Sequence, residues 1–133
     1  MEAEANSREA EAVVPILDEL AAARLRKLVL LQGNDECADC RAPEPTWASV
    51  GQGVFVCTQC AGVHRSLGDA AVVSIKLDKW TDEQLAAMEE AGGNDKANEQ
   101  LEFHVPKDWP HPAKDEAREY REKYIKAKHE ASP

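Results

Sequence analysis

The sequence predicts a small domain of mixed α+β class, and three observations lead to that prediction. Two C-x2-C cysteine pairs stand sixteen residues apart. Between them, the β-prone runs WASV and VFVC flank the glycine-bearing stretch GQG, a layout typical of a hairpin. Apolar residues at helical spacing precede and follow this region. A chain of 133 residues has room for one such domain and short tails.

The first helix is predicted from Pro15, a residue suited to a first turn, and Gly33 and Asn34 are expected to end it. Arg24 falls near the middle of its apolar stripe, so we expect the packed helix to begin only around Ala22. The residues of the stripe are Leu17, Leu20, Ala21, Leu25, Leu28 and Leu31.

The cysteine pairs are the strongest signal in the chain. Each pair can form a knuckle that supplies two thiolates to one tetrahedral ion, and this spacing favours zinc. Because four thiolates fill the coordination shell, we expect one structural Zn²⁺, and four unligated buried thiols are the alternative. His64 lies beyond the second pair and is expected to pack or to hydrogen-bond. The predicted ligands are Cys37, Cys40, Cys57 and Cys60.

After the second pair, AGVHRSLG predicts a short helix that ends at Gly68, and SIKL predicts a half-buried strand. Thr81 and Gln84 fit a capping box, with Trp80 and Leu85 placed as a hydrophobic staple. That helix should run to about residue 90.

Two more helices are expected toward the C-terminus. Gly92 and Gly93 should end the preceding helix, and Asn94 can cap the next one, which should reach about Phe103. Three prolines then enforce an irregular crossing before a last helix over residues 113–128, where Tyr120 and Tyr124 lie one turn apart.

Charge and the terminal segments narrow the class of protein. The net charge is −9, and residues 1–20 hold six acidic side chains and one arginine. An acidic chain lacks the basic field on which most nucleic-acid binding depends, so no nucleic-acid partner is expected. We expect an acidic flexible extension over 1–20, a domain over 21–129 and a tail over 130–133. No apolar run approaches the roughly 18 residues of a membrane span, and no targeting signal is evident, so a cytoplasmic protein is expected.

The stretch CADCRAPEPTWASVGQGVFVCTQCAGVHRSLG closely resembles the Arf GTPase-activating (ArfGAP) domain, whose motif is C-x2-C-x16-C-x2-C with an arginine after four more residues. That arginine is Arg65 here. Trp47, Gly53, the LDKW segment at 77–80 and the pair Gly93–Asn94 also match. The resemblance covers about residues 22–128, is most similar to the small-ArfGAP and plant AGD branch, and implies a zinc finger with a short antiparallel sheet surrounded by helices.

The resemblance also implies a function. Arg65 would be an arginine finger supplied in trans to a GTP-bound Arf-family GTPase, stimulating GTP hydrolysis in the regulation of membrane traffic. The chain would then be an activator and not itself an enzyme, and it has no G-x4-G-K-[ST] loop to bind nucleotide. Recruitment to Golgi, endosomal or plasma membranes would be peripheral, and a monomer suffices. Candidate partner contacts are Trp47, Ser74, Lys76 and Asp78, although a core position is favoured for Trp47.

The segment between Gly68 and Ser74 departs from the family pattern. It reads DAAVV, about two residues shorter than usual, and lacks the basic residue that ordinarily precedes the serine. Two alternatives therefore accompany the activator hypothesis. One is a catalytically weak zinc-finger module that docks Arf or another partner without turnover; the other is a nucleic-acid-binding zinc finger, which the acidic charge disfavours.

Overall fold

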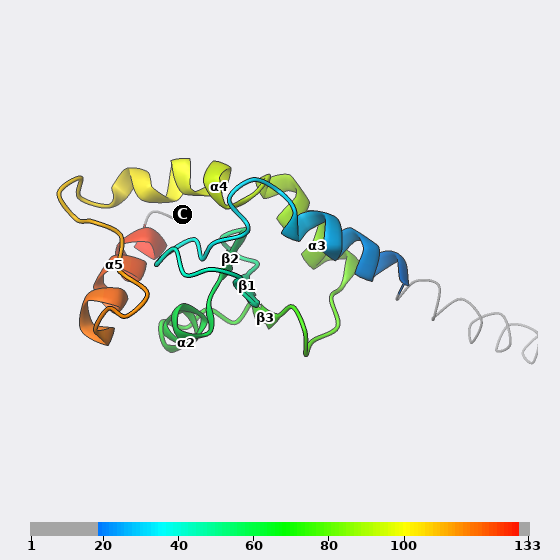
Figure 1. The fold of residues 1–133 in the computed structure, drawn as a ribbon, viewed down its shortest axis with the longest axis horizontal. Helices are drawn as coiled ribbons and strands as arrows, with labels where there is room; N and C mark the ends of the chain where they lie inside the picture. The colour runs from blue at the N-terminus through cyan, green and yellow to red at the C-terminus, as the bar shows by residue number, and fades with distance from the viewer. Residues whose placement is uncertain (1–18, 131–133) are drawn as a thin grey trace, which may run out of the picture.

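The computed structural model describes residues 19–130, and Figure 1 shows a small sheet surrounded by helices, as expected. Residues 19–29 form the first helix that is described. The elements that follow are β1 (Trp47–Ser49), β2 (Val54–Val56), α2 (Thr58–Ser66), β3 (Val72–Ser74), α3 (Asp82–Ala91), α4 (Asn94–Leu101), the 3₁₀ helix η1 (Glu102–His104) and α5 (Arg118–Glu130).

The sheet is antiparallel, in the order β2-β1-β3. The predicted hairpin is confirmed, since Ala48 pairs with Phe55 across the GQG turn. The predicted strand over 74–77 is wrong: β3 lies earlier, over Val72–Ser74. The reason is a turn, because the Ser74 hydroxyl accepts hydrogen bonds from the backbone N–H groups of Lys76 and Leu77. The DAAVV segment thus supplies the third strand.

Alternation along the strands divides the core into two clusters. The cluster that contains the cysteines also receives Trp47, Val54, Val56 and Val72. The other cluster lies beneath the first helix and α3, and it receives the residues of opposite phase, among them Phe55. Its members are Leu28, Ala48, Phe55, Trp80, Leu85 and Met88, with Ala21, Leu25, Val29, Val50, Val73 and Ile75 packed against them.

Among the described residues, packing of the first helix against the core begins at Ala21, close to the start of the packed helix expected near Ala22, while residues 19 and 20 are helical and exposed. Leu20 is 57% exposed despite its place on the predicted stripe, whereas Leu28 is buried. Arg24 leaves the apolar face to bind Asp82 and Glu89 of α3. Leu17, the predicted start at Pro15 and residues 1–18 of the predicted extension over 1–20 lie outside the described residues.

The helix α2 begins at Thr58, earlier than the predicted stretch, because the Cys57 sulfur accepts a hydrogen bond from the Cys60 N–H and caps the helix. Gly68 follows its end with φ +91°, a left-handed conformation that a side chain would strain. In α3 the capping box is confirmed: Thr81 and Gln84 bond each other's backbone, at 2.9 and 3.1 Å.

The prediction that Asn94 caps α4 is wrong. Gly93 occupies the cap position, and the Asn94 side chain turns into the core. There its amide bonds both the N–H (2.7 Å) and the C=O (3.0 Å) of Phe55 in β2, and also the C=O of Glu36 (2.8 Å). The residue therefore fastens α4 to the hairpin. The helix ends at Leu101, and residues 102–104 continue as η1.

The last helix also begins later than predicted, at Arg118 instead of Ala113. The buried guanidinium of Arg121 explains the delay, because it binds the carbonyl oxygens of Ala113, Lys114 and Glu116 at 3.2–3.3 Å. Because those carbonyl oxygens accept hydrogen bonds from a side chain, they are directed away from the backbone N–H groups that would continue a helix. Figure 1 shows α5 lying against α2.

Candidate metal centre and arginine face

The two cysteine knuckles meet at the base of α2. In the first, the N–H of Cys37 bonds the Ala42 C=O at 2.8 Å, and Arg41, with φ +64°, turns the chain back. The second knuckle is the capped first turn of α2. One sulfur from each of the four cysteines lies within 4.8 Å of all the others, and the sulfurs of Cys40 and Cys57 are 3.6 Å apart.

These distances fit one tetrahedral ion. Zinc–sulfur bonds of about 2.3 Å require sulfurs roughly 3.8 Å apart, close to the observed separation. Cys37, Cys40 and Cys60 are buried and Cys57 is partly buried. The structure thus brings all four predicted ligands together at a site that can hold a metal ion, with no place left in the shell for a reacting molecule.

Arg121 is a site residue that the sequence analysis missed. Its guanidinium donates to the sulfur of Cys60 at 3.1 Å and is 2% exposed. Burial alone would lower the pKa of Arg121, but the contact with Cys60 raises it overall. A fixed cation beside a thiolate stabilises the charged ligand. The basic helix over 118–130 gave no signal of this, because Arg121 reaches Cys60 only when α5 packs on α2.

A second buried network lies behind the first knuckle. Lys128 is fully buried and donates to Asp39, Asn98 and the Ala38 C=O, at 2.7, 2.7 and 3.2 Å. Burial would raise the pKa of Asp39, but Lys128 and then His64 lower it well below its usual range. His64 also bonds this carboxylate, at 2.8 Å. The prediction that His64 is a hydrogen-bonding residue and not a fifth ligand of the cysteine site agrees with this position.

Arg65 lies on the last turn of α2 and is exposed. Its guanidinium carbon lies 4.5 Å from the centre of the Trp47 ring, a cation–π contact. Asp69, four residues further along the chain, accepts hydrogen bonds from the Ser49 hydroxyl and from the Ala71 N–H. Over residues 19–130 no ion pair involves Arg65.

Comparison with known proteins decides the family. The profile described as "Putative GTPase activating protein for Arf" matches residues 22–132. The chain belongs to the ArfGAP family. It is 44% identical over 109 residues to the ADP-ribosylation factor GTPase-activating protein AGD12 of Arabidopsis thaliana, covering 80% of this chain and 32% of that protein.

Other relatives agree with this assignment. The human stromal membrane-associated protein 1 is 44% identical over 109 residues, covering 79% of this chain and 23% of that protein. The ArfGap domain of HIV-1 Rev binding protein superposes with a TM-score of 0.78 at 21% identity, over 91% of each chain, which shows the shared fold. The chain spans about a third or less of the length of these curated relatives.

In this ArfGAP domain the four candidate contact residues lie in different settings. Trp47 is partly buried against the cysteine-containing core cluster, while Lys76 and Asp78 are exposed after β3. Ser74 is 3% exposed, and its N–H donates to Asp78 at 2.7 Å. Burial leaves Ser74 little surface for a partner, so its observed role is to hold the turn that presents its neighbours.

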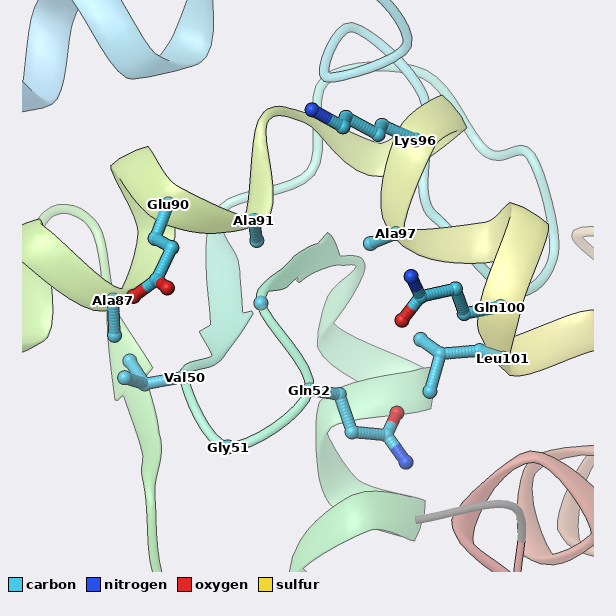
Figure 2. Close-up of a pocket in the computed structure, with 11 residues that line it drawn as sticks. Val50, Gly51, Gln52, Ala87, Glu90, Ala91, Lys96, Ala97, Gln100 and Leu101 are labelled. Atoms are coloured by element: carbon cyan, nitrogen blue, oxygen red, sulfur yellow. The ribbon is translucent and has the colours of Figure 1, made fainter.

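The ArfGAP domain also has a separate open hollow of about 500 Å³ between the hairpin turn, α3 and α4 (Figure 2). Gln52 and Gln100 line it, with Glu90 and Lys96 at other parts of the wall. Neither the cysteines nor Arg65 contribute to it. Among the described helices, none is long and apolar enough to cross a bilayer.

Proposed function

We propose that this chain accelerates GTP hydrolysis by an Arf-family GTPase and that Arg65 is the arginine finger. The single observation that carries the proposal is the setting of Arg65: an exposed arginine, free of ion pairs within residues 19–130, on a helix whose first turn carries two cysteines of the metal site. Family membership supplies the partner class. Relatives such as AGD12 are named as ADP-ribosylation factor GTPase-activating proteins.

The chemistry needs a guanidinium at this place. As the γ-phosphoryl group moves to water, negative charge develops on the transferring group and on the bridging oxygen, and a planar cation with several donors stabilises it. Such a finger supplied in trans is worth about 10³–10⁵ in rate, or roughly 4–7 kcal/mol of barrier. The Arf partner would contribute the nucleotide site, Mg²⁺ and the residue that orients water.

The contact with Trp47 suits this task. A cation–π contact at an exposed site is worth about 0.5–1 kcal/mol, much less than the effect of the finger. It can therefore restrict the Arg65 side chain before docking and still release it toward the nucleotide at little cost. The α2 backbone beneath Arg65 is fixed at both ends, by the Cys57 cap and by the Gly68 turn.

We assign Zn²⁺ to the tetracysteine site, with Cys37, Cys40, Cys57 and Cys60 as ligands. When bound, the ion supplies folding free energy and no reaction chemistry, since its shell is filled by sulfur. The support is the chemistry of four converging thiolates in a partly buried site. Chelation is expected to disorder α2 and so to abolish activity indirectly.

Docking is proposed to use Trp47, Lys76 and Asp78, beside Arg65. The domain limits at 20/21 and 129/130 stay predictions, and α5 continues through Glu130. Other expectations also stay predictions. They are a monomeric state, no bound nucleotide, no nucleic-acid partner, and a cytoplasmic location with recruitment to Golgi, endosomal or plasma membranes.

Single-turnover GTP hydrolysis by a panel of GTP-loaded Arf proteins tests the proposal. The wild type is compared with Arg65→Lys, which keeps the charge and loses the planar fork, and with Arg26→Lys, the same change at another exposed arginine. Zinc content and circular dichroism are checked in all three. Wild type and Arg26→Lys should accelerate hydrolysis by orders of magnitude, and Arg65→Lys should not.

Two results would overturn the assignment. If the zinc-loaded Arg65→Lys variant is as active as the wild type, Arg65 is not the finger. If the wild type binds GTP-loaded Arf saturably yet accelerates no member of the panel, on or off lipid vesicles, the chain is the docking module without turnover.

A further inference from the structure

A second group of metal-ligating side chains lies outside the tetracysteine site. His64, Asp69 and His129 each offer one ligand atom, and these atoms all lie within 4.8 Å of one another. They come from α2, from the loop that follows it, and from the end of α5, which packs against α2 (Figure 1). His129 lies 65 residues after His64 in the sequence, so only the fold brings it to the other two.

The ring of His64 is oriented by a carboxylate, as is typical of histidines that bind metal ions. Its Nε2 lies 2.8 Å from an oxygen of Asp39, and both side chains are fully buried. When His64 is neutral, this bond holds the proton on Nε2 and leaves a lone pair on Nδ1. Histidines that bind metals commonly donate their other N–H to a carboxylate in this way. Lys128 holds Asp39 in place from its other oxygen.

The free nitrogen of His64 faces the other two groups. The Nε2 of His129 lies 2.8 Å from it, and an oxygen of Asp69 lies 3.7 Å from it. Asp69 is held by the Ser49 hydroxyl at 2.6 Å. The Asp69 side chain is 9% exposed and His129 is partly exposed, so solvent reaches the cluster at His129.

The spacing is close to that of a coordinated ion. Metal–nitrogen bonds of about 2.0–2.1 Å place two tetrahedral ligands roughly 3.3 Å apart. The two ring nitrogens need to separate by only about 0.5 Å from their present 2.8 Å, a small movement for the half-buried His129 side chain. The separation between His64 and Asp69 is already near the required value.

We propose that His64, Asp69 and His129 form a second metal site, for a divalent first-row transition ion of the Zn²⁺ type, that clamps the end of α5 onto α2 beside Arg65. Two imidazoles and one carboxylate suit such an ion, whereas Ca²⁺ and Mg²⁺ prefer oxygen ligands throughout. Three protein ligands leave a fourth position for water, so this site binds more weakly than the tetracysteine site and exchanges its ion. The alternative is a direct hydrogen bond between the two histidines with no ion.

Metal counting on the untagged full chain tests the proposal, since an affinity tag of histidines would bind zinc itself. Zinc is measured after equilibrium dialysis at increasing free Zn²⁺, for the wild type, His129→Gln, Asp69→Asn and a control, His104→Gln, which changes an exposed histidine elsewhere. His64 is left unchanged because it is part of the buried core. Titration with Co²⁺ gives a second readout, because tetrathiolate cobalt absorbs far more strongly than cobalt bound by nitrogen and oxygen.

The wild type and His104→Gln should bind two equivalents, one tightly and one weakly, and His129→Gln and Asp69→Asn should bind one. The tetrathiolate cobalt spectrum should be the same in all four proteins. Beyond the first equivalent, added zinc should raise the melting temperature of the wild type and leave that of His129→Gln unchanged. One equivalent in the wild type, or a second equivalent that persists in both ligand variants, would overturn the site and leave the GTPase-activation proposal standing.

Discussion

Replacing Lys128 by methionine should destabilise the domain strongly. The side chain is fully buried, and its ammonium makes three hydrogen bonds that join α5 to the first cysteine knuckle and to α4. Methionine fills much of the same space but cannot donate. The carboxylate of Asp39 would then stay buried with His64 as its remaining charged or polar side-chain partner.

The expected size follows from that uncompensated charge. Breaking a buried ion pair by removing one partner costs about 3–5 kcal/mol, because the other charge keeps its desolvation penalty. A domain of this size has a total stability of about 5–15 kcal/mol, so the loss is a large fraction of it. The matched control is Lys126→Met, which changes an exposed lysine one half-turn away and should alter stability by no more than about 0.5 kcal/mol.

Urea denaturation at a fixed free zinc concentration measures the difference, since zinc release is linked to unfolding. A double variant, Lys128→Met with Asp39→Asn, removes both charges and should be less destabilised than the sum of its single changes by about 0.5–3 kcal/mol. A loss below about 1 kcal/mol in Lys128→Met, or strict additivity in the double variant, would refute the reasoning.

Three further predictions concern other contacts. Arg121→Met removes the donor to a metal-site sulfur and should weaken zinc retention about 10–100-fold in competition with a chelator; unchanged retention would show that the contact is not functional. Gly53→Ala should destabilise the domain by more than about 1 kcal/mol, because φ is +73° and the new Cβ would lie 2.4 Å from that of Ala91, whereas Gly51→Ala meets open space and should be nearly neutral. Thr81→Ala breaks the capping box and should cost about 1 kcal/mol in urea denaturation, an expectation that an unchanged midpoint would contradict.

Much of the architecture could be predicted because the signals are local. The capping box of Thr81 and Gln84 spans three residues, and the hairpin is encoded by two β-prone runs around a glycine turn. The four ligand cysteines follow from their spacing alone, since each C-x2-C pair makes its own knuckle. Arg65 was located through the resemblance, as a position fixed relative to the second pair.

Two of the errors occur where a side chain from elsewhere in the fold overrides a local preference, whereas the shift of β3 comes from the local turn that Ser74 holds. Asn94 has the right identity for a helix cap, yet its amide is taken by Phe55, 39 residues away. Arg121 similarly holds the carbonyls that would have started α5 at Ala113. In both cases the hydrogen bonds to buried polar groups stabilise the domain more than the local motif would, because an unpaired buried group costs about 1–3 kcal/mol.

The sequence by itself indicated the candidate metal ligands, the hairpin, the class of fold and the candidate finger, because these depend on spacings of a few residues or on a motif within one stretch. Only the tertiary structure decided which charges are buried together. Asp39 meets Lys128 across 89 residues, and His64 meets His129 across 65. No periodic pattern in the sequence predicts such pairs, because each of these side chains, taken alone, resembles a solvated surface residue. Their energies arise only when packing removes water from both partners.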